Sequence, residues 1–389
     1  MSQPPVTPAG DEPEQSEPEL TEPQLIDSTE GHPRSGSRAR VLITSGISLL
    51  VLLAVAFILP VPFVKLAPGP TFNVIGNVND QPVISIAGTT TYPTSGELDM
   101  LTVLESGGPR GGLTFVDAIA SWFNASDAVL PRELVYPDDV SGEEVKRRQA
   151  SMFSTSESDA IGAALNYLKM PVGTELVVTS VTSESPADGL LEATDNIIAI
   201  DAKPVTLPKE VSDAVQAKPI GTPFDFEVKR TVAGATQTKH VSVTSAANPD
   251  DATKPYLGIG VGVYYVPDFS IDFTLTDVGG PSAGLMFTLG LIDKLSPADL
   301  AKGRHIAGTG TIAPDGTVGP IGGIRQKLAG ARNKGAELFL MPAVHCTEAE
   351  GHVPDGLTVA AISTLSETVA AIDTWTAGGT PVACPAPQS

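Results

Sequence analysis

The sequence predicts an α+β protein that is anchored by one N-terminal transmembrane helix. Residues 41–64 form a run of 24 residues without a charged side chain. Beyond this run, segments with apolar residues at helical spacing alternate with short β-branched segments, which indicates mixed helix and strand. A chain of 389 residues is too long for one average core. We therefore expect two folded units after the helix, of which one is rich in strands.

The N-terminal segment is strongly acidic. Residues 1–30 contain eight acidic residues, six prolines and no lysine or arginine. Such a segment has little apolar surface to bury, so residues 1–40 are expected to form a disordered cytoplasmic tail. A segment that recruits a partner is the alternative interpretation.

The apolar run at residues 41–64 is long enough to cross a bilayer core of about 30 Å. Pro60 and Pro62 are expected to mark its outer end, because proline lacks a backbone donor. A cleaved signal peptide would be shorter and would begin nearer to Met1. The run therefore predicts a single-pass helix in the cell membrane.

Basic residues flank this helix unevenly. Three arginines lie within the eight residues before it, whereas only Lys65 follows closely: Arg34, Arg38 and Arg40. Positive charge favours the cytoplasmic side. We expect a cytoplasmic N-terminus and an extracytoplasmic position for residues 66–389.

Composition argues against several partners and cofactors. The formal net charge of -21 does not favour nucleic acid, because phosphate binding depends on clustered lysine and arginine. The sequence has no Gly-x-x-x-x-Gly-Lys-Ser/Thr phosphate loop, so neither ATP nor another cofactor is expected. The histidines are scattered, and His345, Cys346 and His352 lack a second ligand pair, so no metal site is expected.

The chain contains two cysteines, Cys346 and Cys384. An even number in an oxidising compartment is consistent with a disulfide, which would tie the C-terminal tail to the last domain. Two unrelated thiols are the alternative.

The first segments after the membrane helix read as mixed structure. Strands are expected at residues 81–87 and 98–104 and helices at residues 115–123 and 157–169. The polar, proline-containing stretch at residues 131–148 is expected to be a loop.

Residues 170–248 have the sequence pattern of a strand-rich domain. Strands at 175–181, 196–200, 224–230 and 239–243 surround a helix at 208–216. With the Ser185-Pro186-Ala187 turn and the Asp201-Ala202-Lys203-Pro204-Val205 turn, this order resembles a bacterial PDZ domain. The resemblance implies that a peptide adds a strand to the sheet edge. The candidate peptide-binding loop contains Gly173 and Thr174. A PDZ fold used only as a spacer or interface is the alternative.

A glycine-rich turn at residues 279–284 contains Ser282, the candidate nucleophile. A serine hydroxyl needs a neighbouring base, and a lysine is such a base only when it is neutral. Lys327, 45 residues later, is expected in the first turns of an apolar-faced helix, where burial and the helix dipole lower a lysine pKa. A serine that only caps its helix is the alternative. Lys334, beside Gly335 at the helix end, reads as a structural lysine.

These segments together resemble the Lon-type proteolytic domain in order and spacing. The matching motifs are Gly280-Pro281-Ser282-Ala283-Gly284, Thr309-Gly310-Thr311-Ile312, Val318-Gly319-Pro320-Ile321-Gly322-Gly323 and Lys327. The resemblance implies Ser282 as nucleophile, Lys327 as general base and Thr309 as a supporting residue. Gly280 replaces the usual aspartate, and its backbone N–H is a candidate oxyanion donor.

The Lon resemblance also implies a discontinuous domain. Ser156-Glu157-Ser158 and the residues that follow look like a helix that precedes the Lon serine. Residues 83–169 and 254–375 are therefore expected to form one domain, with the PDZ-like residues 170–248 inserted. Residues 376–389 would be a proline-rich tail.

The whole arrangement resembles membrane-anchored PDZ-Lon proteins of Gram-positive bacteria. It implies an ATP-independent serine endopeptidase that cleaves unfolded or processed extracytoplasmic polypeptides, and by analogy a homo-oligomer. The alternative is a non-catalytic PDZ scaffold on an inactive Lon-like platform. A Ser-His-Asp site that uses His305 has no motif in its favour.

Overall fold

The computed structural model describes residues 35–108, 112–136, 141–232, 235–275 and 278–385. The predicted acidic tail lies, up to residue 34, outside the described residues. The chain divides into two units, residues 1–55 and residues 56–389. Within the described ranges, one helix is long and apolar enough to cross a membrane: Arg38–Phe57 has a mean hydropathy of 2.2 and no buried side chains.

This segment belongs to helix α1, Ser35–Ile58. The prediction that the helix extends to residue 64 is wrong, because Pro60–Val61 forms strand β1 and Phe63–Asn73 forms strand β2. Pro60 and Pro62 lack the N–H groups that a continuing helix would need. As the sequence predicted, the prolines lie just past the end of the helix.

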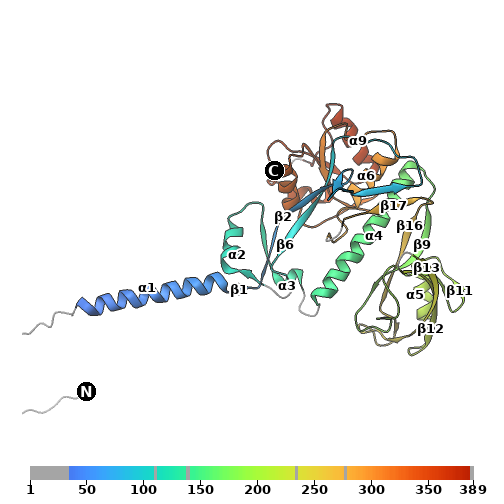
Figure 1. The fold of residues 1–389 in the computed structure, drawn as a ribbon, viewed down its shortest axis with the longest axis horizontal. Helices are drawn as coiled ribbons and strands as arrows, with labels where there is room; N and C mark the ends of the chain where they lie inside the picture. Colours follow the sequence, from blue (N-terminus) through green and yellow to red (C-terminus); the bar gives the residue numbers. More distant parts are fainter. Residues whose placement is uncertain (1–34, 109–111, 137–140, 233–234, 276–277, 386–389) are drawn as a thin grey trace, which may run out of the picture. The chain divides into compact units, whose positions relative to one another are not determined.

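A six-stranded main sheet forms the larger part of residues 56–389 (Figure 1). Its order is β22-β21-β18-β6-β2-β8; the first four strands are parallel and the last two are antiparallel to their neighbours. The bounds not given above are β6 Glu97–Ser106, β8 Ala128–Pro131, β18 His305–Gly308, β21 Leu338–Pro342 and β22 Thr358–Ile362.

Helices cover both faces of the main sheet. Alternation along β6 sorts its side chains, because Leu98 and Met100 belong to one apolar core and Leu101 to another. The core around Leu98 includes residues of α4 (Gly142–Leu168), α6 (Gly284–Leu295) and α9 (Leu365–Thr376). The core around Leu101 includes residues of α7 (Ile324–Lys334) and α8 (Cys346–Ala349).

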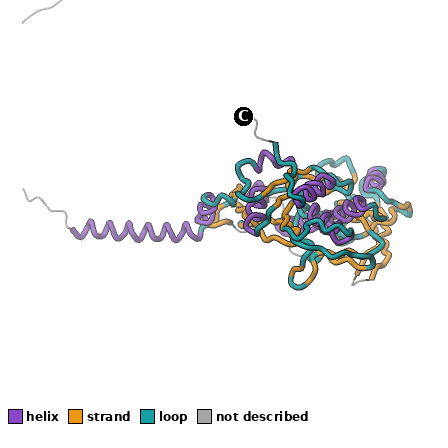
Figure 2. Tube along the Cα trace, turned by 90° about the horizontal axis from the view of Figure 1, so that it is seen from above, coloured by secondary structure: helices purple, strands orange, loops and turns teal. Residues whose placement is uncertain are grey.

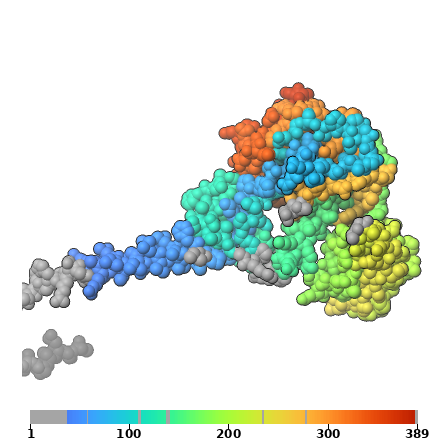
Figure 3. Space-filling model, in the orientation of Figure 1, coloured from blue at the N-terminus to red at the C-terminus, as the bar shows by residue number. Residues whose placement is uncertain are grey.

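Segments far apart in the sequence form this sheet together. Glu97 of β6 is in register with His305 of β18, and β5 (Ile84–Ala87) pairs with β17 (Ser270–Phe273). Figure 3 shows the blue early segment packed against the orange and red C-terminal segments. Pairing of this kind is what a discontinuous domain requires. The sheet begins earlier than predicted, at Phe63 rather than at residue 83, because β2 fills the place between β6 and β8.

A second sheet has the order β13-β12-β10-β9-β16, with β11 beside β10. A buried core that includes Phe224, Phe226 and Val228 lies between this sheet and helix α5, Pro208–Gln216. The strands are β9 Gly173–Val181, β10 Asn196–Ile200, β11 Lys203–Pro204, β12 Pro223–Val232, β13 Ala235–Thr244 and β16 Ile259–Val266.

The sequence missed the last strand of this second sheet. β16 lies outside the predicted range of residues 170–248 and inside the range assigned to the other domain. Its neighbour Leu257 is buried in the core of the second sheet. Residues 255–266 therefore belong structurally to the inserted unit.

The predicted loop at residues 131–148 is also partly wrong. Arg132–Val135 forms α3, and α4 begins at Gly142. Ser141 caps α4 by accepting a hydrogen bond from Glu144 N, which starts the helix in a polar segment without an apolar face. Figure 2 shows helices and strands mixed throughout the larger unit. The remaining short elements are β3 Asn77–Val78, β4 Gln81–Pro82, β7 Leu113–Thr114, α2 Phe115–Trp122, β14 Ala246–Ala247, β15 Pro255–Tyr256, β19 Thr311–Ile312, β20 Val318–Gly319 and η1 Ala343–His345.

A disulfide joins Cys346 to Cys384, 38 residues later. The same tail is held by a hydrogen bond from Ala361 N to Val382 O (2.8 Å). The proline-rich segment predicted at residues 376–389 is therefore attached to the domain near its end; residues 386–389 lie outside the described residues.

Candidate active site

Ser282 lies in the turn immediately before α6. Its carbonyl oxygen accepts two hydrogen bonds, one from Gly310 N and one from Thr309 Oγ1, both 3.1 Å. The preceding carbonyl, of Pro281, accepts from Ser156 Oγ of α4 (3.0 Å). The backbone around the nucleophile is thus held from two sides.

Lys327 lies in the first turn of α7. Gly323 caps this helix with a positive φ of 71°, which favours glycine, and a Cβ at this position would meet Val103 Cγ2 at 2.7 Å. Lys327 N donates to Gly323 O (3.1 Å), which fixes the lysine one turn into the helix.

The two side chains meet. Lys327 Nζ lies 2.7 Å from Ser282 Oγ and 3.0 Å from Thr309 Oγ1. Lys327 is 2% exposed, and burial lowers its pKa to about 7. The geometry brings together the three residues that the sequence analysis linked, and the lysine can exist as the neutral amine that a base requires.

The fourth predicted member is placed differently. Gly280 N donates to Gln149 O of α4 (3.1 Å), so this N–H is not free to bind an oxyanion. The prediction of a free donor at Gly280 is wrong because α4 extends farther toward its N-terminus than the sequence suggested. Among the described residues, the N–H groups of Ser282 and Ala283 donate no such bond and lie at the start of α6.

A pocket of about 290 Å³ lies beside Pro281. Helix α4, strand β9, Pro281 and the β19 segment line it. The lining acid is Asp159, whose pKa burial raises to about 6. The pocket adjoins the nucleophile turn and contains a contribution from Thr179 of the second sheet.

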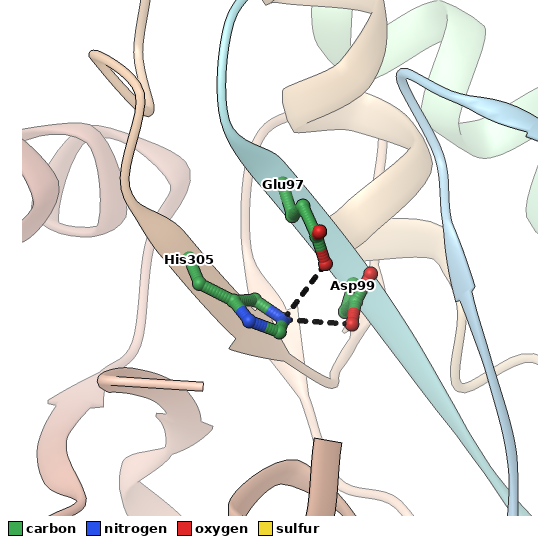
Figure 4. Close-up of side chains that lie close together, drawn as sticks. All are labelled: Glu97, Asp99 and His305. Carbon is green, nitrogen blue, oxygen red and sulfur yellow. Dashed lines mark hydrogen bonds and ion pairs between the residues drawn. The ribbon is translucent and has the colours of Figure 1, made fainter. Parts of the chain in front are cut away.

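His305 has other partners than Ser282. Figure 4 shows one nitrogen of its ring facing two acids of β6: Nε2 lies 2.8 Å from Asp99 Oδ2 and 3.3 Å from Glu97 Oε2. The nitrogen and carboxylate oxygens of these three side chains lie within 4.8 Å of one another. The buried Asp99 is already paired with His305, and burial raises its pKa. His305 and Thr309 lie four residues apart along an extended segment, so their Cα atoms are roughly 13 Å apart, and the His305 ring contacts Asp99 and Glu97 rather than Ser282.

The predicted peptide-binding residues lie in a strand rather than a loop. Gly173 and Thr174 begin β9, where they pair with Val266 and Tyr265 of β16. The prediction of a loop at this position is therefore wrong, because β16 provides a partner strand that the sequence analysis did not find.

Two further residues hold the site and were missed. Ser156 binds Pro281 O, and His345 Nε2 accepts from Ile321 N (2.9 Å) in the segment that leads into α7. His345 Nδ1 lies 3.1 Å from Glu348 Oε2. Ser156 lies among other small polar residues, so nothing in the sequence indicated that it contacts Pro281. No spacing pattern linked His345 to Ile321, 24 positions earlier.

Two segments of the chain match known families. Residues 273–372 match the Lon protease (S16) C-terminal proteolytic domain, and residues 153–244 match the PDZ domain. Lon protease 1 of Sorangium cellulosum is 44% identical over 64 residues, which are 16% of this chain and 8% of that protein. Lon protease of Roseiflexus castenholzii is 36% identical over 69 residues, 18% of this chain and 8% of that protein. The chain thus matches only a small part of these relatives' length.

Solved PDZ structures are also similar to the inserted unit. The PDZ domain of an SdrC-like protein from Listeria monocytogenes is 23% identical, covers 22% of this chain and 86% of its own, and has a TM-score of 0.20. The corresponding domain from Listeria innocua is 25% identical with the same TM-score and covers 22% of this chain and 92% of its own. From the family matches, the chain combines a PDZ domain with the C-terminal proteolytic domain of Lon, a serine-type peptidase domain.

Proposed function

We propose that this chain is a membrane-tethered, ATP-independent serine endopeptidase with Ser282 and Lys327 as its dyad. The observation that carries the proposal is the 2.7 Å contact between Lys327 Nζ and Ser282 Oγ, with the lysine buried and its pKa lowered to about 7. Its substrates are unfolded or processed polypeptides on the extracytoplasmic side, selected in part by the PDZ domain.

The proposed reaction follows from this geometry. Neutral Lys327 takes the hydroxyl proton of Ser282 as Oγ attacks a peptide carbonyl carbon. The N–H groups of Ser282 and Ala283 at the start of α6 stabilise the resulting oxyanion. The C–N bond then breaks, the lysine returns its proton to the leaving amine, and a water molecule hydrolyses the acyl-serine ester with Lys327 again as base.

Thr309 supports the dyad as a positioning residue. Its hydroxyl donates to Ser282 O and accepts from Lys327 Nζ (3.1 and 3.0 Å). The neutral lysine then uses one N–H for Thr309 and keeps its single lone pair for the serine proton. A side chain beside the bond to be cleaved would enter the pocket next to Pro281.

Peptide capture is proposed at the outer edge of β16. β16 is the end strand of the second sheet, and Gly258, with φ of 80°, precedes it. Tyr265 N at the far end is bound by Ser158 Oγ (2.8 Å), whereas between Ile259 and Val263 no described strand pairs with this edge. An extended peptide would add a strand there.

The tether and the compartment are part of the proposal. The described helix α1 is long and apolar enough to span a bilayer, and Arg38 and Arg40 lie at its N-terminal end. The sequence contains no phosphate loop, which supports cleavage without ATP. Residues 63–169 and 267–375 form the proteolytic domain in this proposal, with the PDZ domain inserted.

The test is hydrolysis of fluorescein-labelled casein by the full chain in detergent micelles without ATP. Ser282→Ala and Lys327→Ala should each lower the rate by about 10³-fold or more while the variants keep their folded spectra. Lys334→Ala, on the exposed C-terminal end of the same helix, should leave the rate unchanged.

A non-catalytic scaffold is the competing function, since Gly280 replaces the aspartate usual in Lon proteases. A serine-reactive fluorophosphonate probe separates the two. Labelling of Ser282 that depends on Lys327 supports the peptidase. No labelling together with no casein hydrolysis supports the scaffold, whereas casein hydrolysis that Ser282→Ala does not reduce rules out the dyad.

A further inference from the structure

Helix α2 and the neighbouring α3 present large apolar side chains to the surroundings. Phe123 is 87% exposed and Trp122 68%, and Leu134 of α3 is 74% exposed. Phe115 lies seven residues before Trp122, so both are on one face of the helix, and Phe115 is 45% exposed. An adjacent side of α2 packs inward through Ala118 and Ser121, which are buried. Outside α1, no other described large apolar side chain is as exposed as Phe123.

These side chains are attached to the backbone that directly follows the apolar span. Phe115 N donates to Leu59 O (3.3 Å), and Pro60 pairs with Thr114. From α3, Arg132 N donates to Pro62 O (3.0 Å). Both short helices are thereby bound to backbone that lies at most five residues after Phe57, where the span ends.

The position of these apolar side chains next to the span decides which partner fits them. The polar interface of a bilayer adds roughly 5–8 Å on each side of the hydrocarbon core, and aromatic side chains concentrate there. An α2 of eight residues is only about 12 Å long, so Phe115 and Trp122 both stay near this layer. A protein partner would have to replace lipid at a site that the span itself brings to the membrane.

We propose that Phe115, Trp122, Phe123 and Leu134 form an interfacial membrane anchor that inserts at the headgroup–acyl boundary of the outer leaflet. The proposal rests on the proposed membrane tether, and it does not depend on the peptidase activity. With this second attachment, the start of β2, which continues into the main sheet, is held at the membrane surface rather than on a free linker.

The test reconstitutes the full chain in phosphatidylcholine vesicles and uses tryptophan fluorescence. The chain has two tryptophans, and Trp375 is buried, so the difference between the wild type and Trp122→Phe reports Trp122 alone. We expect blue-shifted Trp122 emission that is lost with lipids brominated near the headgroup end of their acyl chains. Aqueous iodide should have little effect.

A matched control places an exposed tryptophan on the PDZ domain. In Trp122→Phe combined with Leu207→Trp, the new residue at the start of α5, where Leu207 is 54% exposed, should be quenched by iodide and not by the brominated lipids. Iodide quenching of Trp122 overturns the anchor, and so does shielding from both quenchers, which would indicate a second copy or another protein. Failure of the chain to float with vesicles overturns the tether and the anchor together, whereas floating without lipid quenching removes the anchor only.

Discussion

At the scale of single residues, Lys327, the proposed base, has a cost in stability. Burial that lowers its pKa from 10.5 to about 7 costs roughly 5 kcal/mol relative to an unfolded chain at neutral pH. Its neighbours are two neutral hydroxyls, of Ser282 and Thr309. Neither hydroxyl offsets the charge of a protonated lysine, and a neutral amine at this position is what the proposed reaction requires.

Replacing this lysine should raise stability and abolish activity. We expect Lys327→Met to increase the free energy of unfolding at pH 7 by several kcal/mol, since methionine fills similar space without a charge. The folded wild type binds fewer protons than the unfolded chain between about pH 7 and 10.5. The free energy of unfolding of the wild type should thus rise with pH in that window, and its difference from that of Lys327→Met should become smaller. Thermal unfolding at pH 7 and 9.5 measures this.

Lys334→Met is the control for that experiment, because Lys334 is exposed on the same helix. Its free energy of unfolding should differ from that of the wild type by the same small amount at both pH values. A gap between Lys327→Met and the wild type that is equal at both pH values would mean that Lys327 is not neutral in the folded protein.

At the scale of elements, α4 connects the PDZ domain to the nucleophile. Toward the PDZ sheet, Ser158 Oγ accepts from Tyr265 N, and Ser154 Oγ from the Tyr264 hydroxyl (3.1 Å). Toward the active site, Ser156 and Gln149 bind the carbonyl of Pro281 and the N–H of Gly280. One helix therefore shares its polar groups between the proposed peptide edge and the Ser282 turn.

Removing one hydroxyl tests this connection. Ser158→Ala removes a buried hydroxyl and leaves the partly buried Tyr265 N–H without its partner, which should lower stability by about 1–3 kcal/mol. Ser154→Ala is the matched control and should cost less, because the partly exposed Tyr264 hydroxyl can bind water instead. Limited proteolysis of the β16 segment measures both. Equal protection of the two variants would contradict a specific role for Ser158.

The sequence predicted only the part of α4 whose apolar residues recur at helical spacing. Ala164 and Leu165 lie on the face that the spacing indicated. Earlier turns of α4 also make hydroxyl contacts through Ser151, Ser154 and Ser156, which no periodicity shows. β16 was missed because glycines interrupt its apolar residues. The dyad was predictable because Ser282 and Lys327 each lie at a glycine-marked helix start. The occupied N–H of Gly280 depends on where α4 begins and was not predictable.

At the scale of the whole molecule, the disulfide links the fold to the proposed topology. Cys346 and Cys384 lie beside the core that includes α7, the helix of Lys327. A bond that closes a loop of this length should stabilise the domain by about 2–4 kcal/mol. Such a bond persists in an oxidising compartment, which is the side of the membrane proposed for this domain.

We expect Cys384→Ser to lower the free energy of unfolding by that amount, because the unfolded chain regains the freedom that the loop had removed. The measurement is thermal unfolding of the wild type with and without reductant, beside the variant, which should be insensitive to reductant. In intact cells, both cysteines should resist maleimide until they are reduced. Immediate labelling of both by a membrane-permeant maleimide, but by no impermeant one, would place this domain on the cytoplasmic side and overturn the proposed topology.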